Sequence, residues 1–280
     1  MLTNQLKKFI QEALTEDIKD GDHTSLASIS KDENNCAELL VKDNGIIAGI
    51  ELAEYIFKTI DSQIIIKKNF VDGDKIKKGD IAFTIEGNAI AILSAERLVL
   101  NCMQRMSAIS SKTADLCKLI ADTKTKILDT RKTTPLNRYI EKWAVRIGGG
   151  LNHRFGLYDA MMIKDNHIDF AGSLTKAIHK CKEYQNKNNL NLDIIVEARN
   201  IIEVREILLQ TGIKRILLDN FDLSQTKEAV NIIARKCETE SSGSINKETI
   251  REYALCGVDY ISVGELTHSV ENFDLSLNAV

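Results

Sequence analysis

The chain has 280 residues, 44% of them hydrophobic and 28% charged, which is enough to bury a sizeable core and excludes a disordered protein. Its formal net charge of -3 gives no reason to expect a nucleic acid or a membrane surface as a partner. The six cysteines form no C-x-x-C pair, and no apolar run reaches the roughly 18 residues that a membrane span requires. We therefore expect a cytoplasmic protein with reduced thiols.

The N-terminal part of the chain predicts a helix, a group of short strands and a second, longer helix. Apolar residues recur at helical spacing over the first 18 positions, and the charges between them are unlike a signal peptide. After a loop rich in Asp and Gly, turn residues separate short strands expected at 35–42, 45–50, 64–67 and 81–86. A helical pattern then runs from about residue 94 to residue 120, and we place a domain boundary inside it.

From about Lys126 the pattern changes to apolar strands that alternate with amphipathic helices. The strand-like segments are KILD, MMIK, DIIVEA, RILLD, CETES and DYISVG. This βαβ repeat predicts a parallel sheet, either open and doubly wound or closed into a barrel. Because no G-x-G-x-x-G follows the first strand, the pattern favours a barrel.

Polar residues collect at the C-terminal ends of these strands. They are Arg131, Lys132, Lys164, Glu197, Asp219, Ser242, Gly243 and Gly264. Each could by itself be a capping or turn residue. In a β/α barrel, however, these strand ends share one face, so the side chains are expected to meet around one mouth.

The segment from Leu128 to His167 is rich in Lys and Arg although the chain as a whole is slightly acidic. A local cationic field of this kind indicates a small anionic ligand. Arg131 and Arg154 can each grip a carboxylate with two hydrogen bonds, so together they suit a small dicarboxylate. Arg138, Lys142 and Arg146 equally suit a solvated helix face. The glycine run 148–150 indicates a helix end, a close ligand approach or a moving loop.

Glu197 and Asp219 each end an apolar strand, where an unpaired carboxylate is costly. Mg²⁺ or a sugar hydroxyl would satisfy both, and a pair of structural salt bridges is the alternative. The segment 241–244, SSGS, lies between a strand and a helix expected to begin near Asn246, where backbone N–H groups hold phosphate. Gly264 offers a second close backbone approach.

These motifs together resemble the quinolinate phosphoribosyltransferase family. The resemblance is carried by GDHTS, ERLVLNCMQRMSAIS, DTRKTTP, GGGLNHRFGLYDAMMIKDNH, LLDN and SSGSIN, which cover nearly the whole chain. It implies an N-terminal α/β sandwich at 1–108, an incomplete β/α barrel at 109–267, and a segment 268–280 that returns to the N-terminal domain. It also implies a homodimer, or a larger oligomer built from it, in which one subunit's N-terminal domain covers its partner's barrel mouth.

The resemblance further implies a reaction and assigns residues to it. Quinolinate would receive the phosphoribosyl group of phosphoribosyl pyrophosphate with loss of pyrophosphate and carbon dioxide, giving nicotinate mononucleotide for NAD synthesis. Lys132, Glu197 and Asp219 would be catalytic, and the two acids would lie near Mg²⁺. Quinolinate would be bound by Arg105, lent by the neighbouring subunit, with Arg131, His153, Arg154 and Lys164. The phosphoribosyl donor would be bound by Lys132, Lys164, Ser242, Gly243, Ser244, Gly264 and His268.

The sequence departs from the family pattern at four positions. Leu136 and Asn137 replace a usual Gly-Leu, Ser244 stands where a second Gly is usual, and Arg199 replaces a common acidic residue. Two competing interpretations are a related barrel protein found with molybdenum transport genes and a non-catalytic sensor of sugar phosphates or dicarboxylates. The intact NHR and KDNH motifs argue against the first, and the retention of Lys132, Glu197 and Asp219 argues against the second.

Overall fold

A computed structural model describes residues 3–280, which group into two compact units. The first unit contains the chain up to Ala114 together with Thr133–Gly149 and Ser269–Val280. The second unit contains Asp115–Lys132 and Gly150–His268. The domain boundaries expected at residues 108 and 267 stay predictions, and the first of them falls within one continuous helix, Ala89–Leu119.

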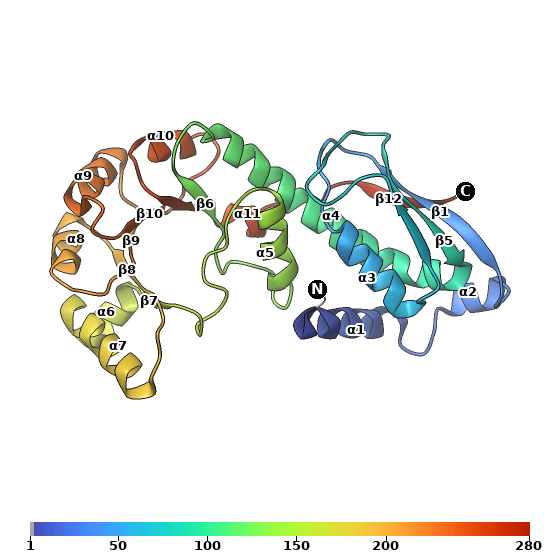
Figure 1. The fold of residues 1–280 in the computed structure, drawn as a ribbon, viewed down its shortest axis with the longest axis horizontal. Coiled ribbons are helices and arrows are strands. Elements are labelled where there is room, and N and C mark those ends of the chain that lie inside the picture. Colours follow the sequence, from blue (N-terminus) through green and yellow to red (C-terminus); the bar gives the residue numbers. More distant parts are fainter. Residues whose placement is uncertain (1–2) are drawn as a thin grey trace. The chain divides into compact units, whose positions relative to one another are not determined.

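The first unit is built around a four-stranded antiparallel sheet with the order β12-β1-β5-β3. Its elements are α1 (Asn4–Ile18), α2 (His23–Ser28), β1 (Asn34–Val41), β2 (Gly45–Ile46), α3 (Ile50–Ile60), β3 (Ile65–Lys68), β4 (Lys75–Ile76), β5 (Ile81–Asn88), most of α4 (Ala89–Leu119), α5 (Arg138–Ile147) and β12 (Leu275–Ala279). The last strand pairs with β1, so the C-terminal segment completes this sheet (Figure 1).

Alternating burial shows which face of this sheet forms the core. In β1, Ala37, Leu39 and Val41 are buried while their neighbours are more exposed, which is the period of two expected of a strand with one covered face. Helix α3 packs on the sheet through Phe57, whose ring meets that of Phe83 edge to face at 6.3 Å between centroids.

Three local expectations for this unit were wrong. The strand expected at 45–50 ends at Ile46, because Gly49 has a left-handed backbone (φ 97°) and Asp72 accepts a hydrogen bond from the N–H of Ile50, the first residue of α3. The loop expected around residue 25 contains helix α2. Lys142, expected as one candidate for a solvated stripe on α5, is 1% exposed.

The second unit confirms the predicted βαβ pattern. Its elements are β6 (Lys126–Leu128), β7 (Met161–Ile163), α6 (Asp165–Ala171), α7 (Leu174–Asn188), β8 (Ile194–Ala198), α8 (Ile201–Leu208), β9 (Arg215–Asp219), α9 (Leu223–Ile233), β10 (Glu238–Ser242), α10 (Ile250–Leu255), β11 (Tyr260–Ser262) and α11 (Glu265–His268). All neighbouring strands are parallel, in the order β6-β11-β10-β9-β8-β7. The strands therefore follow one another around an arc, with β6 and β7 at its two open edges, as in an incomplete barrel (Figure 1).

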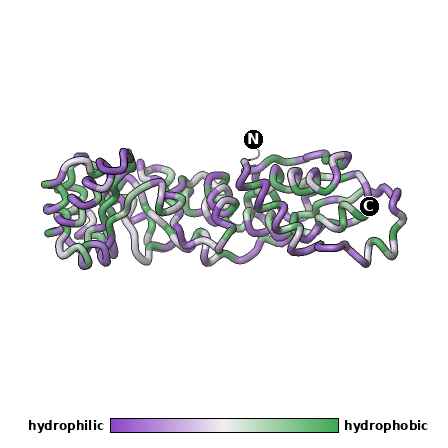
Figure 2. The backbone as a smooth tube through the Cα atoms, turned by 90° about the horizontal axis from the view of Figure 1, so that it is seen from below, coloured by the Kyte–Doolittle hydropathy of each residue, from purple (hydrophilic) through white to green (hydrophobic). Residues whose placement is uncertain are grey.

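Three helices of the second unit begin at a residue whose side chain caps them. Ser173, Asn200 and Asp222 each accept a hydrogen bond from a backbone N–H of the first turn of α7, α8 and α9. Hydrophobic and hydrophilic stretches are interspersed along the whole backbone (Figure 2). Because all six strands are parallel, their carboxyl ends lie at the same edge of the sheet.

Within residues 3–280 no helix is both long and apolar enough to cross a membrane.

Candidate active site

A cavity of about 820 Å³ opens at the carboxyl ends of the strands of the second unit. Twelve residues predicted for the site line it, namely Arg131, Lys132, His153, Arg154, Lys164, Glu197, Asp219, Ser242, Gly243, Ser244, Gly264 and His268. Their meeting confirms the expected geometry of the strand ends. The roles assigned to the individual residues stay predictions.

Arg105, the remaining predicted residue, belongs to α4 in the first unit. Its Nε and Nη2 atoms donate to Oε1 of Glu141 at 3.2 and 3.0 Å. Glu141 is fully buried, and its second oxygen accepts a hydrogen bond from the N–H of Thr134. The guanidinium is therefore held by a buried carboxylate that is itself hydrogen-bonded to the backbone.

One side of the cavity is cationic. Burial lowers the pKa of Arg154, and the charge of Arg131 lowers it further, so the two guanidinium groups repel each other. Asp129, fully buried at the end of β6, organises this side: its carboxylate accepts hydrogen bonds from the N–H of His153 and from the Asn152 amide. An anion with two acidic groups placed between the arginines would relieve their repulsion.

The loop after β11 packs directly against Lys132. A Cβ atom on Gly264 would lie 3.1 Å from both the Lys132 Cδ and the His268 Nε2, so a larger residue here would push against both side chains. Thr267 donates its hydroxyl to the Lys132 carbonyl at 2.8 Å. Lys132, Gly264 and His268 thus form one close-packed corner of the cavity.

The opposite side carries the two carboxylates. Glu197 is 6% exposed, and its Oε2 accepts a hydrogen bond from the Lys164 Nζ at 2.6 Å. Burial raises the pKa of Glu197, the bond to Lys164 opposes this, and the charge of Asp219 adds to the rise. The two acids therefore lie close enough to repel each other, and one lysine does not fully compensate them.

Asn220 joins Asp219 to the serine-glycine loop after β10. Its Nδ2 donates to the Asp219 Oδ2, and its backbone N–H donates to the Ser242 carbonyl, both at 2.9 Å. Its Oδ1 fills the space where a Cβ on Gly243 would lie, only 2.2 Å away. The helix expected near Asn246 was placed too early, because a turn covers 246–249 and α10 begins at Ile250. The N-terminus of α10 therefore does not directly follow the serine-glycine loop.

Two of the three consecutive glycines have structural reasons unconnected with a ligand. A Cβ on Gly148 would lie 2.5 Å from the Ser110 carbonyl of α4, and Gly149 adopts a left-handed conformation (φ 91°) after α5. Both belong to the first unit. They explain the glycine run as the end of a tightly packed helix.

Sequence analysis missed several residues of the cavity, above all Asn220 and Glu240; the others are Thr130, Met162, Leu217, Ile245, Asn246, Ser262 and Glu265. Asn220 is part of the LLDN motif and was assigned no role. Glu240 lies in the middle of β10, and a charged residue inside a buried strand was the signal that could have identified it.

The fold and the cavity define a β/α-barrel enzyme for small phosphorylated and carboxylated substrates, with cations on one side and paired acids beside a phosphate-type loop on the other. Comparison with known proteins specifies the family. Residues 22–107 match the N-terminal domain of quinolinate phosphoribosyl transferase and residues 109–278 match its C-terminal domain. The chain belongs to the quinolinate phosphoribosyltransferase family.

Individual relatives agree with this assignment. The chain is 45% identical over 290 residues to quinolinate phosphoribosyltransferase [decarboxylating] 2a, mitochondrial, of Nicotiana tabacum, covering 98% of this chain and 82% of the relative. It is 44% identical over 292 residues to nicotinate-nucleotide pyrophosphorylase [carboxylating], chloroplastic, of Arabidopsis thaliana, covering 98% and 83%. Among solved structures, NadC from Streptococcus pyogenes has a TM-score of 0.91 at 35% identity, covering 99% of this chain and 97% of that one. The nicotinate-nucleotide pyrophosphorylase from Francisella tularensis has a TM-score of 0.91 at 37% identity, covering 99% and 96%.

Proposed function

We propose that the chain transfers the phosphoribosyl group of phosphoribosyl pyrophosphate to quinolinate, with release of pyrophosphate and carbon dioxide, to form nicotinate mononucleotide for NAD synthesis. The observation that carries this proposal is the meeting of a cationic side and an acidic side in one cavity of a chain that matches both domains of the family. The cationic side suits the dicarboxylate, and the acidic side with its loops suits the sugar phosphate.

Quinolinate would bind between Arg131 and Arg154. Each planar guanidinium can donate two hydrogen bonds to one of quinolinate's two carboxylates. His153 and Lys164 complete this part of the cavity. The repulsion between the two arginines supports the assignment, because a bound dianion removes it.

The phosphoribosyl donor would bind along the strand ends from β8 to β11. Its 5′-phosphate suits the loop Ser242–Ser244, which lines the cavity after β10, and its pyrophosphate suits Lys132 with Gly264 and His268. Glu197 and Asp219 would then face the ribose. As the anomeric bond breaks, the sugar becomes cationic, and these two carboxylates would stabilise that charge.

Magnesium fits the acidic side of the cavity. Glu197 and Asp219 repel each other across a space that one lysine only partly neutralises. Within residues 3–280 no three His, Cys, Asp or Glu side chains gather as a complete metal site. Mg²⁺ commonly takes one or two carboxylates and completes its shell with substrate oxygens and water, so Glu197 and Asp219 would hold it. When bound, it would supply charge stabilisation to the pyrophosphate leaving group.

Decarboxylation would follow once the ring nitrogen is alkylated. Loss of the adjacent carboxylate leaves negative charge on a ring carbon, which the positive ring nitrogen and the cations of Lys132, Lys164 and the arginines would stabilise. No side chain is required as a covalent nucleophile.

The proposal includes a homodimer in which Arg105 serves the neighbouring subunit's cavity, and a cytoplasmic location. Arg105 lies in the first unit and the cavity in the second, which is the division of residues that a shared site requires. The six free cysteines suit a reducing compartment. The names of the plant relatives place those proteins in mitochondria and chloroplasts, so the compartment of this chain stays a prediction.

A direct assay tests the function. The purified chain with quinolinate, phosphoribosyl pyrophosphate and Mg²⁺ is expected to release pyrophosphate and carbon dioxide in equal amounts. Lys132→Met is expected to abolish both, whereas Lys187→Met, a change of the same kind on the exposed side of α7, leaves them unchanged. Absence of pyrophosphate release from the folded wild-type chain would refute the proposal.

A further inference from the structure

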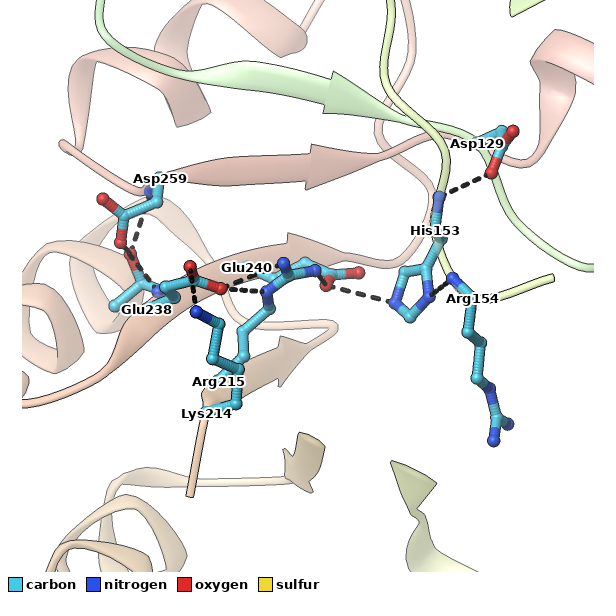
Figure 3. Close-up of polar contacts among 9 residues, drawn as sticks. Asp129, His153, Arg154, Lys214, Arg215, Glu238, Glu240 and Asp259 are labelled. Carbon is cyan, nitrogen blue, oxygen red and sulfur yellow. Dashed lines mark hydrogen bonds and ion pairs between the residues drawn. The ribbon is translucent and has the colours of Figure 1, made fainter. Parts of the chain in front are cut away.

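A row of alternating charges leads from His153 in the cavity to Lys214, and its members Glu240, Glu238, Arg215 and Lys214 have no role in the reaction proposed above. Lys214 and Arg215 both contact Glu238, at 3.2 and 3.0 Å. Arg215 also donates through Nη1 to the Glu240 Oε2 at 2.9 Å, and the same oxygen lies 3.3 Å from the His153 Nε2. Figure 3 shows Glu240 between Arg215 and His153.

Glu240 is the pivotal member because it is completely buried and still lines the cavity. A buried carboxylate is costly unless it is paired. Arg215, which stacks on the Tyr260 ring at 4.0 Å, pairs with it from one side and His153 from the other. Burial raises the pKa of Glu240, but its contact with His153 and the charge of Arg215 outweigh that effect and lower it overall, so Glu240 carries its negative charge.

His153 is held in one orientation and one tautomer. Its backbone N–H donates to Asp129 at 2.8 Å, and its Nδ1 accepts the N–H of Arg154 at 2.6 Å. Because Nδ1 accepts a hydrogen bond, it carries no hydrogen, and the ring hydrogen is on Nε2, the atom that faces Glu240. The imidazole thereby links the buried Glu240 to the backbone of Arg154, whose side chain extends away from the ring (Figure 3).

We propose that Glu240 is a positioning residue for the quinolinate-binding side of the cavity. Backed by Arg215, it holds the Nε2–H tautomer of His153, and through His153 it fixes the backbone from which the Arg154 guanidinium reaches the substrate. The part of this inference that concerns quinolinate rests on the proposed function. The part that concerns His153 is a property of the free protein.

Glu238 provides a matched control. It lies two residues before Glu240 on the same face of β10 and contacts the same Arg215, but on the far side of that arginine from His153 (Figure 3). Glu240→Met removes the oxygen that faces His153 while keeping the length of the side chain. Glu240→Gln restores an oxygen acceptor without the charge.

The first measurement is calorimetric binding of quinolinate to the full-length chain, followed by steady-state kinetics. The charged Glu240 Oε2 lies 3.3 Å from the His153 Nε2 and orients the ring electrostatically, so Glu240→Met is expected to weaken quinolinate binding by roughly tenfold. Glu240→Gln is expected to recover most of the loss, and Glu238→Met to bind as the wild type does. The KM for phosphoribosyl pyrophosphate should stay unchanged in all three variants, since a general loss of structure would raise both KM values.

The second measurement is the ¹⁵N NMR spectrum of the histidine rings. The chain has five histidines, and substituting each in turn assigns its signals. The His153 signals are expected to report hydrogen on Nε2, and the Nε2 signal to shift in Glu240→Met and Glu240→Gln but not in Glu238→Met. Unchanged quinolinate affinity in folded Glu240→Met overturns the proposal. Should that variant fail to fold, an unchanged Nε2 signal in Glu240→Gln overturns it. If the wild type binds no quinolinate while the His153 signals respond as expected, the proposed function fails and the positioning of His153 stands.

Discussion

At the scale of single residues, Asn220 shows how one side chain can connect two parts of a site. Its backbone is left-handed (φ 55°), a conformation that Asn tolerates better than most residues. From this position it donates to the Asp219 carboxylate and fills the space beside Gly243. Asn220 therefore sets the orientation of a predicted catalytic acid relative to the predicted phosphate loop.

Asn220→Gly tests this connection without backbone strain, since glycine adopts the left-handed conformation freely. Loss of the hydrogen bond to Asp219 is expected to raise the KM for phosphoribosyl pyrophosphate about fivefold. The KM for quinolinate should stay close to that of the wild type, as steady-state kinetics would measure. Asn220→Ala, the control for strain, should show the same kinetic change with a further stability loss of about 1 kcal/mol. A wild-type KM in Asn220→Gly would show that Asp219 needs no such partner.

Two of the departures from the family's glycine pattern also have left-handed backbones. Leu136 has φ 66° and Ser244 has φ 50°, so each adopts a conformation that glycine would adopt with less strain. Leu136 is 89% exposed and has little packing to lose. Its side chain is thus unfavourable at a turn that the family pattern fills with glycine.

We expect Leu136→Gly to stabilise the protein by roughly 0.5–1 kcal/mol, the strain relieved less the entropy that glycine loses on folding. Urea unfolding with linear extrapolation would measure the gain. Leu136→Ala keeps the Cβ atom and should give no comparable gain. If both variants behave alike, the effect comes from removing an exposed apolar side chain and not from the backbone.

At the scale of elements, the strands of the barrel could be predicted and several short helices could not. The strands β8 and β9 are apolar runs bounded by turns, a pattern that needs no tertiary information. Helix α3 begins where Asp72, 22 residues further along the chain, accepts its first N–H. A helix start that depends on such a distant residue has no local signal, and α11, with four residues, is too short to show a period.

Helix α2 depends on a local cap that gives a pH-dependent prediction. Asp22 accepts hydrogen bonds from the hydroxyl and the backbone N–H of Ser25, and these bonds lower its pKa. A lowered pKa in the folded state means that the stabilisation is complete above the unfolded value of about 3.9 and is lost as the pH falls through the folded value.

Asp22→Ala is therefore expected to cost about 1 kcal/mol at pH 7, and the cost should shrink below pH 4. Denaturant unfolding of both chains between pH 2.5 and 7 would measure the difference. Asp20→Ala, in the same loop but outside the cap, should change stability little at any pH. A cost that is independent of pH would mean that the carboxylate charge has no part in the cap.

At the scale of the whole molecule, the sequence predicts that side chains far apart in the chain meet at one cavity. It does not predict all of the side chains that line that cavity. Residues at strand ends, such as Lys164 and Glu197, were identified because a barrel brings all such ends to one face. Glu240 lies inside β10, where only the way the surrounding elements pack decides that its carboxylate meets Arg215 and His153. Burial and pairing of that kind belong to the tertiary structure alone.

Subunit complementation tests the proposed sharing of sites. Arg105→Ala and Lys132→Ala are each expected to be inactive, and their mixture should regain roughly a quarter of the wild-type activity if the two chains assort randomly into dimers. The regained activity arises because one site of each mixed dimer then has both residues.

Lys132→Ala with Glu197→Ala is the matched negative mixture, since both residues lie in the second unit and every site keeps one defect. Failure of the first mixture to regain activity, with mixed dimers demonstrated by mass spectrometry, would contradict the shared site.

The pairing of β12 with β1 has a consequence for the way this protein is made. The strand that covers β1 follows the entire second unit in the chain, so one edge of β1 stays unpaired while the second unit is being made. Domains at the start of a chain usually fold first as they leave the ribosome, but here the first unit cannot complete its sheet until the whole second unit and β12 have been made. Nascent chains of this protein therefore expose a strand edge that can pair with other chains. Either a chaperone covers this edge or the chains aggregate through it.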